Sequence, residues 1–337
     1  PYEQNLYASV SDRIIGQVDK TWFQNVAFYG PVALALYAIP NLILGQSSLM
    51  ELVVFLKFLW LFFYLGVGWL ALKYWAALPD RLARTVTVLA SPVLLWYGLV
   101  DGHVDLLILF FLLLTASLMK AGKAVPSALS LAAAASIKIV GIVSLPVCFF
   151  WWLNRSKKGA AVFSATFLVV YGGIYFALKG GEYPRVVEFT KLWNNLEAAN
   201  LVPRLLGHTS LELTQVQLLS NLLFYGTVLA VSLLTWRGVF GSDPALPMAW
   251  VMAALFLTRT YFQPWYTLWF WPLLWFSDVD GRTFRGQFYL WTVTVLSAWL
   301  IPWEYKGYFV GLSSLVALIL ATRNRDAFKR TEPAGYA

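Results

Sequence analysis

The sequence predicts an all-α fold, a polytopic bundle of membrane-spanning helices. Of the 337 residues, 59% are hydrophobic and 12% are charged, whereas a soluble domain carries about 25% charged residues. The charges gather in short clusters, and the apolar runs between them approach the roughly 20 residues that cross a bilayer core as a helix. Runs such as 106–118 and 160–178 are apolar on every side. They lack the two-residue period of a transmembrane strand, so helices are expected.

Eleven apolar stretches separated by the charge clusters are predicted to be spans. Several of them are shorter than about 17 residues, so 124–137 and 139–153 are expected to be half-length helices or helices of a thin bilayer. The predicted spans are 50–72, 85–100, 104–119, 124–137, 139–153, 160–178, 216–235, 245–258, 264–276, 287–301 and 308–322. One more span is expected ahead of Pro1, which makes about twelve in the full protein.

The distribution of Lys and Arg predicts the orientation. Most of the 25 basic residues fall in loops that alternate with the spans as one side of a membrane should, and such loops are cytoplasmic. The net charge of +8 is therefore assigned to the membrane and not to nucleic acid binding. The clusters are Lys73–Arg84, Lys120–Lys123, Arg155–Lys158, Arg237, Arg282–Arg285 and Arg323–Arg330.

The same count divides the chain into regions. Residues 29–45 are apolar but contain Pro31, Pro40 and Asn41, so we expect an interfacial or re-entrant helix pair on the external side. In order, the predicted regions are an external segment with juxtamembrane helices (1–49), transmembrane helices (50–178), a large external loop (179–215), transmembrane helices (216–322) and a cytoplasmic tail (323–337).

The first candidate site is the turn from Asp101 through His103 to Asp105. Ionisable groups near hydrocarbon are costly and usually face water or each other. Two carboxylates beside an imidazole suit a divalent cation or orient a hydroxyl group. The alternative is that Asp101 caps the next helix while His103 and Asp105 face headgroups.

Two cations are candidate partners of a phosphate group. Lys138 lies inside an apolar run, where it either snorkels to the interface or points inward to an anionic group. Arg259 precedes a turn with Gln263, Trp265 and Tyr266. Its planar fork suits phosphate oxygens, and the two aromatic rings suit a sugar face. The alternative is that these aromatic residues belong to an interfacial belt.

A polar stretch near Asn200, Arg204 and His208 is a candidate acceptor site, and a solvated connector is the alternative reading. Asp12 and Asp19 lie in a segment that reads as an amphipathic surface helix, and neither is assigned a catalytic role.

The order of these motifs resembles the GT-C glycosyltransferases, and is most similar to the bacterial mannosyltransferases that use polyprenyl-phosphate mannose. The resemblance covers nearly the whole chain, and His103 stands where these enzymes often carry Gln. The motifs that carry it are Pro1-Tyr2-Glu3, Tyr29-Gly30-Pro31, Ser91-Pro92, Gly102-His103-Val104-Asp105, Lys138, Asn200 with Arg204, and Gln263-Pro264-Trp265-Tyr266 with Trp269 and Pro272.

The resemblance implies transfer of a sugar, mannose first, from a polyprenyl-phosphate donor to a hydroxyl of a glycan or glycolipid acceptor. It implies a cell-envelope enzyme in the bacterial cytoplasmic membrane with an external active site. The base of the family is typically an Asp of the first external loop, which is expected before Pro1, so no catalytic base is assigned. The only cofactor considered is a divalent cation.

Two other functions remain open. About twelve spans also suit a secondary transporter, but transporters place ionisable residues near the midplane between repeated halves. A non-catalytic subunit of cell-envelope assembly is the other alternative. The candidate charges lie at one face beside a large external loop, and this arrangement favours an enzyme.

Overall fold

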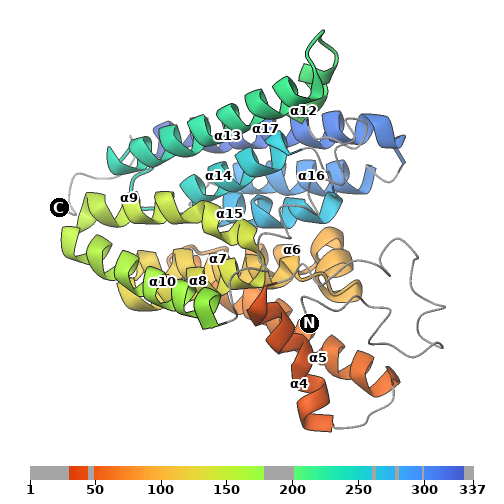
Figure 1. Ribbon diagram of the computed structural model, residues 1–337, viewed down its shortest axis with the longest axis vertical. Helices are drawn as coiled ribbons and strands as arrows, with labels where there is room; N and C mark the ends of the chain where they lie inside the picture. Colours follow the sequence, from red (N-terminus) through yellow and green to blue (C-terminus); the bar gives the residue numbers. More distant parts are fainter. Residues whose placement is uncertain are drawn as a thin grey trace.

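The computed structural model describes residues 30–44, 49–177, 201–259, 263–277, 281–297 and 300–329. Within these ranges the chain forms helices and no strands (Figure 1), so the predicted all-α fold is confirmed. The elements are α4 (Pro31–Leu44), α5 (Leu49–Tyr74), α6 (Arg81–Leu89), η1 (Leu94–Val100), α7 (Asp105–Lys120), α8 (Ala124–Ile137), η2 (Ile139–Ser144), α9 (Leu145–Arg155), α10 (Lys157–Ala177), α12 (Leu201–Gly207), α13 (Leu213–Trp236), α14 (Ala245–Thr258), η4 (Pro264–Trp269), α15 (Trp271–Phe276), α16 (Gly281–Ser297) and α17 (Trp303–Lys329).

Each predicted apolar stretch coincides with one helix or with a broken pair. The stretch 85–100 is broken, because α6 and η1 meet at a bend of 63°. Ser91-Pro92 lies at this bend, and a proline has no N–H to continue the ladder of a preceding helix. The stretch 139–153 begins as the 3-10 turn η2 before it continues as α9.

Among the described residues, four helices are long and apolar enough to cross a membrane, or five if the bent pair α6–η1 is one span. The four are Met50–Tyr74, Lys157–Ala177, Leu213–Trp236 and Tyr305–Thr322. The other predicted spans are shorter: α8 and α14 each have 14 residues, or about 21 Å at 1.5 Å per residue, against a core of about 30 Å. The eleven crossings therefore stay a prediction.

Helix α14 forms the centre of the bundle. Every one of its residues is buried except Trp250. The indole N–H of Trp250 donates to Thr322 Oγ1 of α17 at 3.0 Å. Long apolar faces of α5, α10 and α13 are exposed instead. A helix that is apolar on all sides fits either a protein interior or lipid. Here α14 lies in the protein interior, and the exposed apolar faces of the outer helices suit lipid.

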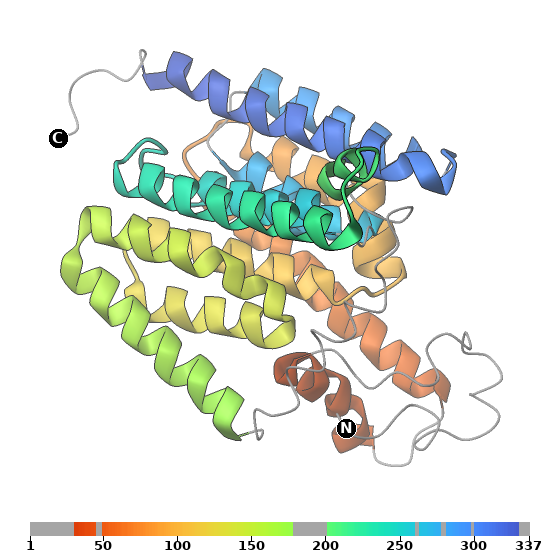
Figure 2. The same cartoon turned by 45° about the horizontal axis from the view of Figure 1, so that its top comes forward.

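One end of the bundle collects the predicted basic loops. Tyr74 at the end of α5 donates to Asp243 Oδ1 before α14 at 2.5 Å, and Lys120 at the end of α7 lies 4.4 Å from the Tyr74 ring. The α9–α10 and α13–α14 turns lie at the same end of the molecule (Figure 2). The loops that hold four of the six basic clusters (Lys73–Arg84, Lys120–Lys123, Arg155–Lys158 and Arg237) therefore share one end, while the side of the membrane that they face stays a prediction.

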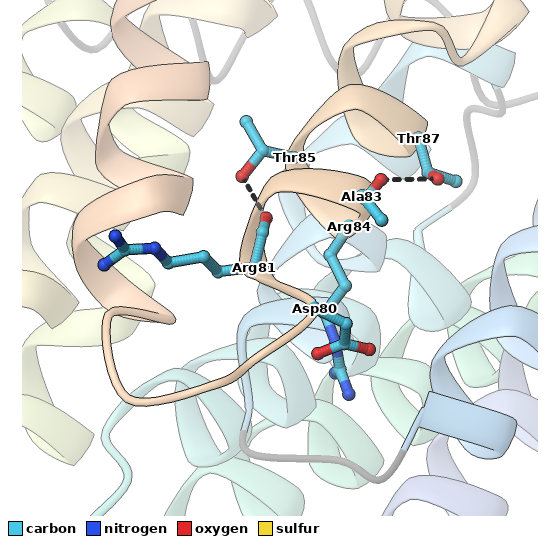
Figure 3. Close-up of polar contacts among 6 residues, drawn as sticks. All are labelled: Asp80, Arg81, Ala83, Arg84, Thr85 and Thr87. Atoms are coloured by element: carbon cyan, nitrogen blue, oxygen red, sulfur yellow. Dashed lines mark hydrogen bonds and ion pairs between the residues drawn. The ribbon is translucent and has the colours of Figure 1, made fainter.

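At the start of α6 one arginine is buried in an ion pair and another is exposed. Arg84 is buried, and its Nε donates to both carboxylate oxygens of Asp80 at 3.0 Å (Figure 3). Its guanidinium carbon also lies 5.9 Å from the Trp75 ring. Arg81 instead is exposed and donates to the Ala76 carbonyl at 3.2 Å.

Candidate functional site

Asp105 is the centre of the cluster of predicted site residues. It begins α7 and is 1% exposed. Its Oδ1 accepts from Lys138 Nζ at 3.3 Å and from Trp269 Nε1 at 2.5 Å. A buried carboxylate is tolerated only when it is paired and hydrogen-bonded. Asp105 therefore holds together three segments that lie far apart in the sequence: α7, the end of α8, and η4.

Lys138 occupies a break between two helices. It is the C-cap of α8, in an extended conformation with φ −154° and ψ 132°. The break is compact because η2 approaches α8 closely: a Cβ on Gly141 would lie 2.7 Å from the backbone of Ala134 and Ala135. The Lys138 side chain is 13% exposed. Its ammonium points inward and does not snorkel to an interface.

Two aromatic rings enclose the Lys138 ammonium. Its Nζ lies 4.5 Å from the centroid of Tyr266 and 5.0 Å from that of Trp269. These two rings stack on one another with centroids 4.3 Å apart and planes 20° apart. Cation–π attraction is strongest where water is excluded. The ion pair and the rings therefore fix the orientation of η4.

The turn before α7 brings His103 onto Trp265. Their rings stack with centroids 4.2 Å apart and an interplanar angle of 18°. Asp101 Oδ2 lies 3.7 Å from His103 Nε2. Gly102 has φ +69°, a conformation that glycine adopts without strain, and this lets the chain reverse between Asp101 and His103.

Burial lowers the pKa of the His103 imidazole, and it outweighs the carboxylates of Asp105 and Asp101, which act in the opposite direction. The imidazole is therefore neutral at pH 7, because the ordinary pKa of His is already about 6.5. A neutral ring both donates and accepts a hydrogen bond.

We call these residues the Asp105 cluster: Asp101, His103, Asp105, Lys138, Trp265, Tyr266 and Trp269. All but Trp269 were predicted as site residues. Gln263 lies at its edge, as the N-cap of η4, where its carbonyl accepts the Tyr266 N–H at 3.1 Å. Asp101 follows η1 and does not cap α7, whose N-cap is Val104.

Arg259 contacts α13 instead of the charged members of this cluster. Its Nη1 donates to Asn221 Oδ1 at 3.2 Å, and its guanidinium carbon lies 4.8 Å from the Phe224 ring. Its Nε is buried and has no hydrogen-bond partner among the described residues. The three charged candidates Lys138, Arg259 and Asp101 therefore contact different partners, which are Asp105, Asn221 and His103 in that order.

Arg204 lies in a helix and not in the expected polar loop. It is 6% exposed within α12, and its guanidinium carbon lies 5.3 Å from the ring of Tyr308 on α17. His208 stacks on the same ring with centroids 6.0 Å apart. The interpretation of 200–209 as a loop is wrong for 201–207, because the apolar residues of α12 pack on the bundle. Asn200, Asp12 and Asp19 lie outside the described residues.

Two residues beside the cluster were not predicted. Trp60 on α5 donates through Nε1 to the His103 carbonyl at 3.2 Å. Tyr37 on α4 packs on Trp60 with ring centroids 5.4 Å apart, and it is close enough to Asp105 for the carboxylate charge to act on its phenol. Only the tertiary packing of α4 and α5 reveals them, because in the sequence both are aromatic residues within apolar runs, like many others in this chain.

The described residues offer little to a metal ion. No group of three or more His, Cys, Asp or Glu side chains comes together within them. Asp105 is bonded to Lys138 and Trp269, which leaves the pair Asp101 and His103. A divalent cation therefore finds no set of three ligands in the part of the chain that the structure describes.

Comparison with protein families gives a match over the N-terminal part of the chain. Residues 1–154 match a family model described as alpha-(1->6)-mannopyranosyltransferase, N-terminal domain (the MptA_B family). The matched stretch contains Asp101, His103, Asp105 and Lys138 but ends before Arg259 and η4, and it is less than half of the chain. No curated protein and no solved structure matches. The match supports a mannosyltransferase family.

Proposed function

We propose that the protein is a membrane glycosyltransferase that moves mannose from a polyprenyl-phosphate donor to an acceptor hydroxyl. The observation that carries the proposal is the Asp105 cluster, because it joins polar and aromatic residues from three distant segments at one place. The match of residues 1–154 to a mannosyltransferase family supports the same reading. The proposed active site faces the external side of the membrane.

In this proposal the His103–Trp265 stack and Asp101 receive the sugar. Aromatic faces bind the C–H faces of a sugar ring, while polar groups beside them take its hydroxyls. The Asp101 side chain is 36% exposed, so its carboxylate is available to accept a hydroxyl hydrogen. The neutral imidazole of His103 adds a donor or an acceptor.

Lys138 has a different role from the one expected from the sequence. Its charge is already balanced by Asp105, so it adds little net positive charge for a departing phosphate. We assign the Asp105–Lys138 pair to positioning: it holds Trp269 and Tyr266, and through η4 it places Trp265 against His103. A preorganised site of this kind reduces the cost of orienting the substrate.

Arg259 is the stronger candidate for the phosphate. Its buried Nε has no partner among the described residues, and an anion at this point would accept its hydrogen. In the reaction, the acceptor oxygen bonds to the anomeric carbon as the bond from that carbon to the phosphate oxygen breaks. The acceptor proton passes to a base, which we do not assign, and the negative charge that grows on the phosphate is stabilised by the guanidinium.

The position of Arg259 also suits a lipid-linked donor. Its partner Asn221 lies on α13, where Leu218, Leu222 and Tyr225 are 59%, 58% and 63% exposed. A polyprenyl chain on this apolar face stays in lipid while its phosphate reaches Arg259. The donor class is thus proposed from a cation placed at the edge of a lipid-facing helix.

The test is a transfer assay with radiolabelled polyprenyl-phosphate mannose and the full-length protein. Trp265→Ala and Arg259→Ala should each lower turnover at least tenfold, whereas Lys123→Ala, at the other end of α8, should leave it unchanged. Wild-type turnover in both site variants would contradict the assignment. Sugar flux into proteoliposomes without a covalent product would identify a transporter, and neither flux nor product would indicate a non-catalytic subunit.

A further inference from the structure

Hydrogen bonds connect the α9–α10 turn to the α13–α14 turn. Both turns lie at the end of the bundle that is opposite to the Asp105 cluster. Asn154 Nδ2 donates to the Trp236 carbonyl at 2.6 Å, and Arg155 Nη2 donates to the Gly241 carbonyl at 2.9 Å. Figure 2 shows the two turns at the same end of the bundle. They form one surface, which we call the basic turn pair, consisting of residues 154–160 and 235–244.

Three cations of this surface point outward. Lys157, Lys158 and Arg237 are exposed, and among the described residues no carboxylate pairs with any of them. The one acidic residue of the basic turn pair is Asp243, which is 3% exposed and accepts from Tyr74 Oη and from the Ala245 N–H. Its charge is directed inward, so the positive charge of the surface is left uncompensated.

An exposed indole and a lipid-facing helix lie beside the cations. Trp236, directly before Arg237, is 47% exposed. It ends α13, on which Leu229 is 59% and Leu233 39% exposed. Trp is enriched at the level of the headgroups, where one side of its ring is apolar and the other is wet. Along α13 the apolar face is therefore at the depth of the acyl chains, the Trp236 indole at the depth of the interface, and the cations at the depth of the headgroups.

We propose that the basic turn pair binds the headgroup of an anionic phospholipid. Lys157, Lys158 and Arg237 face its phosphate and any second negative charge, while Trp236 lies at the depth of the glycerol backbone. The attraction of a cation to an anionic lipid surface is about 1 kcal/mol for each Lys or Arg, which is about fivefold in affinity per cation. The proposal is independent of sugar transfer, because it uses none of the residues of the Asp105 cluster.

The experiment is native mass spectrometry of the full-length protein in detergent, titrated with phosphatidylglycerol or with phosphatidylcholine. For wild type, the first phosphatidylglycerol should bind at least tenfold more tightly than the first phosphatidylcholine. The variant Lys157→Gln/Lys158→Gln/Arg237→Gln should bind the two lipids within about threefold of each other. The matched control Lys73→Gln/Arg81→Gln/Lys123→Gln removes the same charge from the other loops of this end, and it should keep the wild-type preference.

Two results would overturn the proposal. An equal loss in both triple variants would mean that the whole end attracts anions without a site, and an unchanged preference in the first variant would exclude these residues. If that triple variant loses its fold, Arg237→Gln alone decides, because it should lower the preference severalfold. Raising the salt to 0.5 M should weaken phosphatidylglycerol binding to wild type, since exposed charges are screened, and salt-independent binding would count against the site.

Discussion

The buried ion pair between Asp105 and Lys138 allows a quantitative prediction. Asp105→Asn keeps an oxygen for the Trp269 N–H but leaves the Lys138 ammonium, 13% exposed, without a counter-charge. Removing one partner of a buried pair costs about 3–5 kcal/mol. The rings of Tyr266 and Trp269 still face the ammonium and offset about 1–2 kcal/mol of this cost. We therefore expect Asp105→Asn to lower the free energy of unfolding by about 2–3 kcal/mol.

The double variant Asp105→Asn/Lys138→Met removes both charges. No unpaired charge is then left in the interior, so its loss of stability should be no larger than that of either single variant. The coupling energy of the cycle should therefore be at least about 2 kcal/mol, since residues in one buried pair couple by about 0.5–3 kcal/mol. Unfolding of the detergent-solubilised protein by SDS, followed by circular dichroism, supplies the four free energies.

A second cycle on Asp80 and Arg84 is the control (Figure 3). The Asp80 side chain is 46% exposed, and pairs with a solvated partner couple by about 1 kcal/mol or less. A coupling below about 0.5 kcal/mol for Asp105 and Lys138, or one no larger than that of the control pair, would refute their role as the buried centre of the cluster.

Two further predictions follow from the backbone and from the imidazole. Gly141→Ala places a methyl group 2.7 Å from the α8 backbone and should lower the free energy of unfolding by about 1–3 kcal/mol. The control Gly172→Ala meets nothing within 4 Å and should not lower it. An equal effect of the two substitutions would contradict the close approach of η2 to α8 beside Lys138. Burial lowers the pKa of His103 in the folded protein. The unfolded chain therefore binds a proton near pH 6.5, whereas the folded chain does not, and the free energy of unfolding should fall as the pH drops through this range. His103→Gln should lack that part of the acid dependence, as measured by unfolding at pH 5.5 and 7.5, and an identical pH dependence in the two proteins would contradict the buried neutral ring.

The sequence was sufficient to predict the helices, because apolar runs bounded by charge clusters leave few alternatives. It also singled out Asp101, His103, Asp105, Lys138, Trp265 and Tyr266 among its candidate site residues, and the structure brings these six together. The reason is that each is a polar or aromatic residue at the end of an apolar helix. Helices of similar length place such ends at similar depth.

The partners within the site were not predictable. Lys138 was expected to face a phosphate, yet it pairs with Asp105, because the break between α8 and η2 turns the chain inward at Lys138. Arg259 was expected, like Lys138, to face a phosphate, and it contacts Asn221 and Phe224, since the rotation of α14 against α13 decides which way this residue, directly after α14, points. Such choices depend on helix rotation and crossing, which apolar periodicity does not report in helices that are apolar on all sides.

The most direct test of the proposed site compares two ligands that differ only in the sugar. Binding of polyprenyl-phosphate mannose and of polyprenyl phosphate to the purified full-length protein is measured for wild type, Trp265→Ala and Arg259→Ala. Trp265→Ala should weaken the mannosylated lipid about tenfold, or about 1.4 kcal/mol, and leave polyprenyl phosphate unchanged, while Arg259→Ala should weaken both. If Trp265→Ala weakens both ligands equally or neither of them, the His103–Trp265 stack does not hold the sugar.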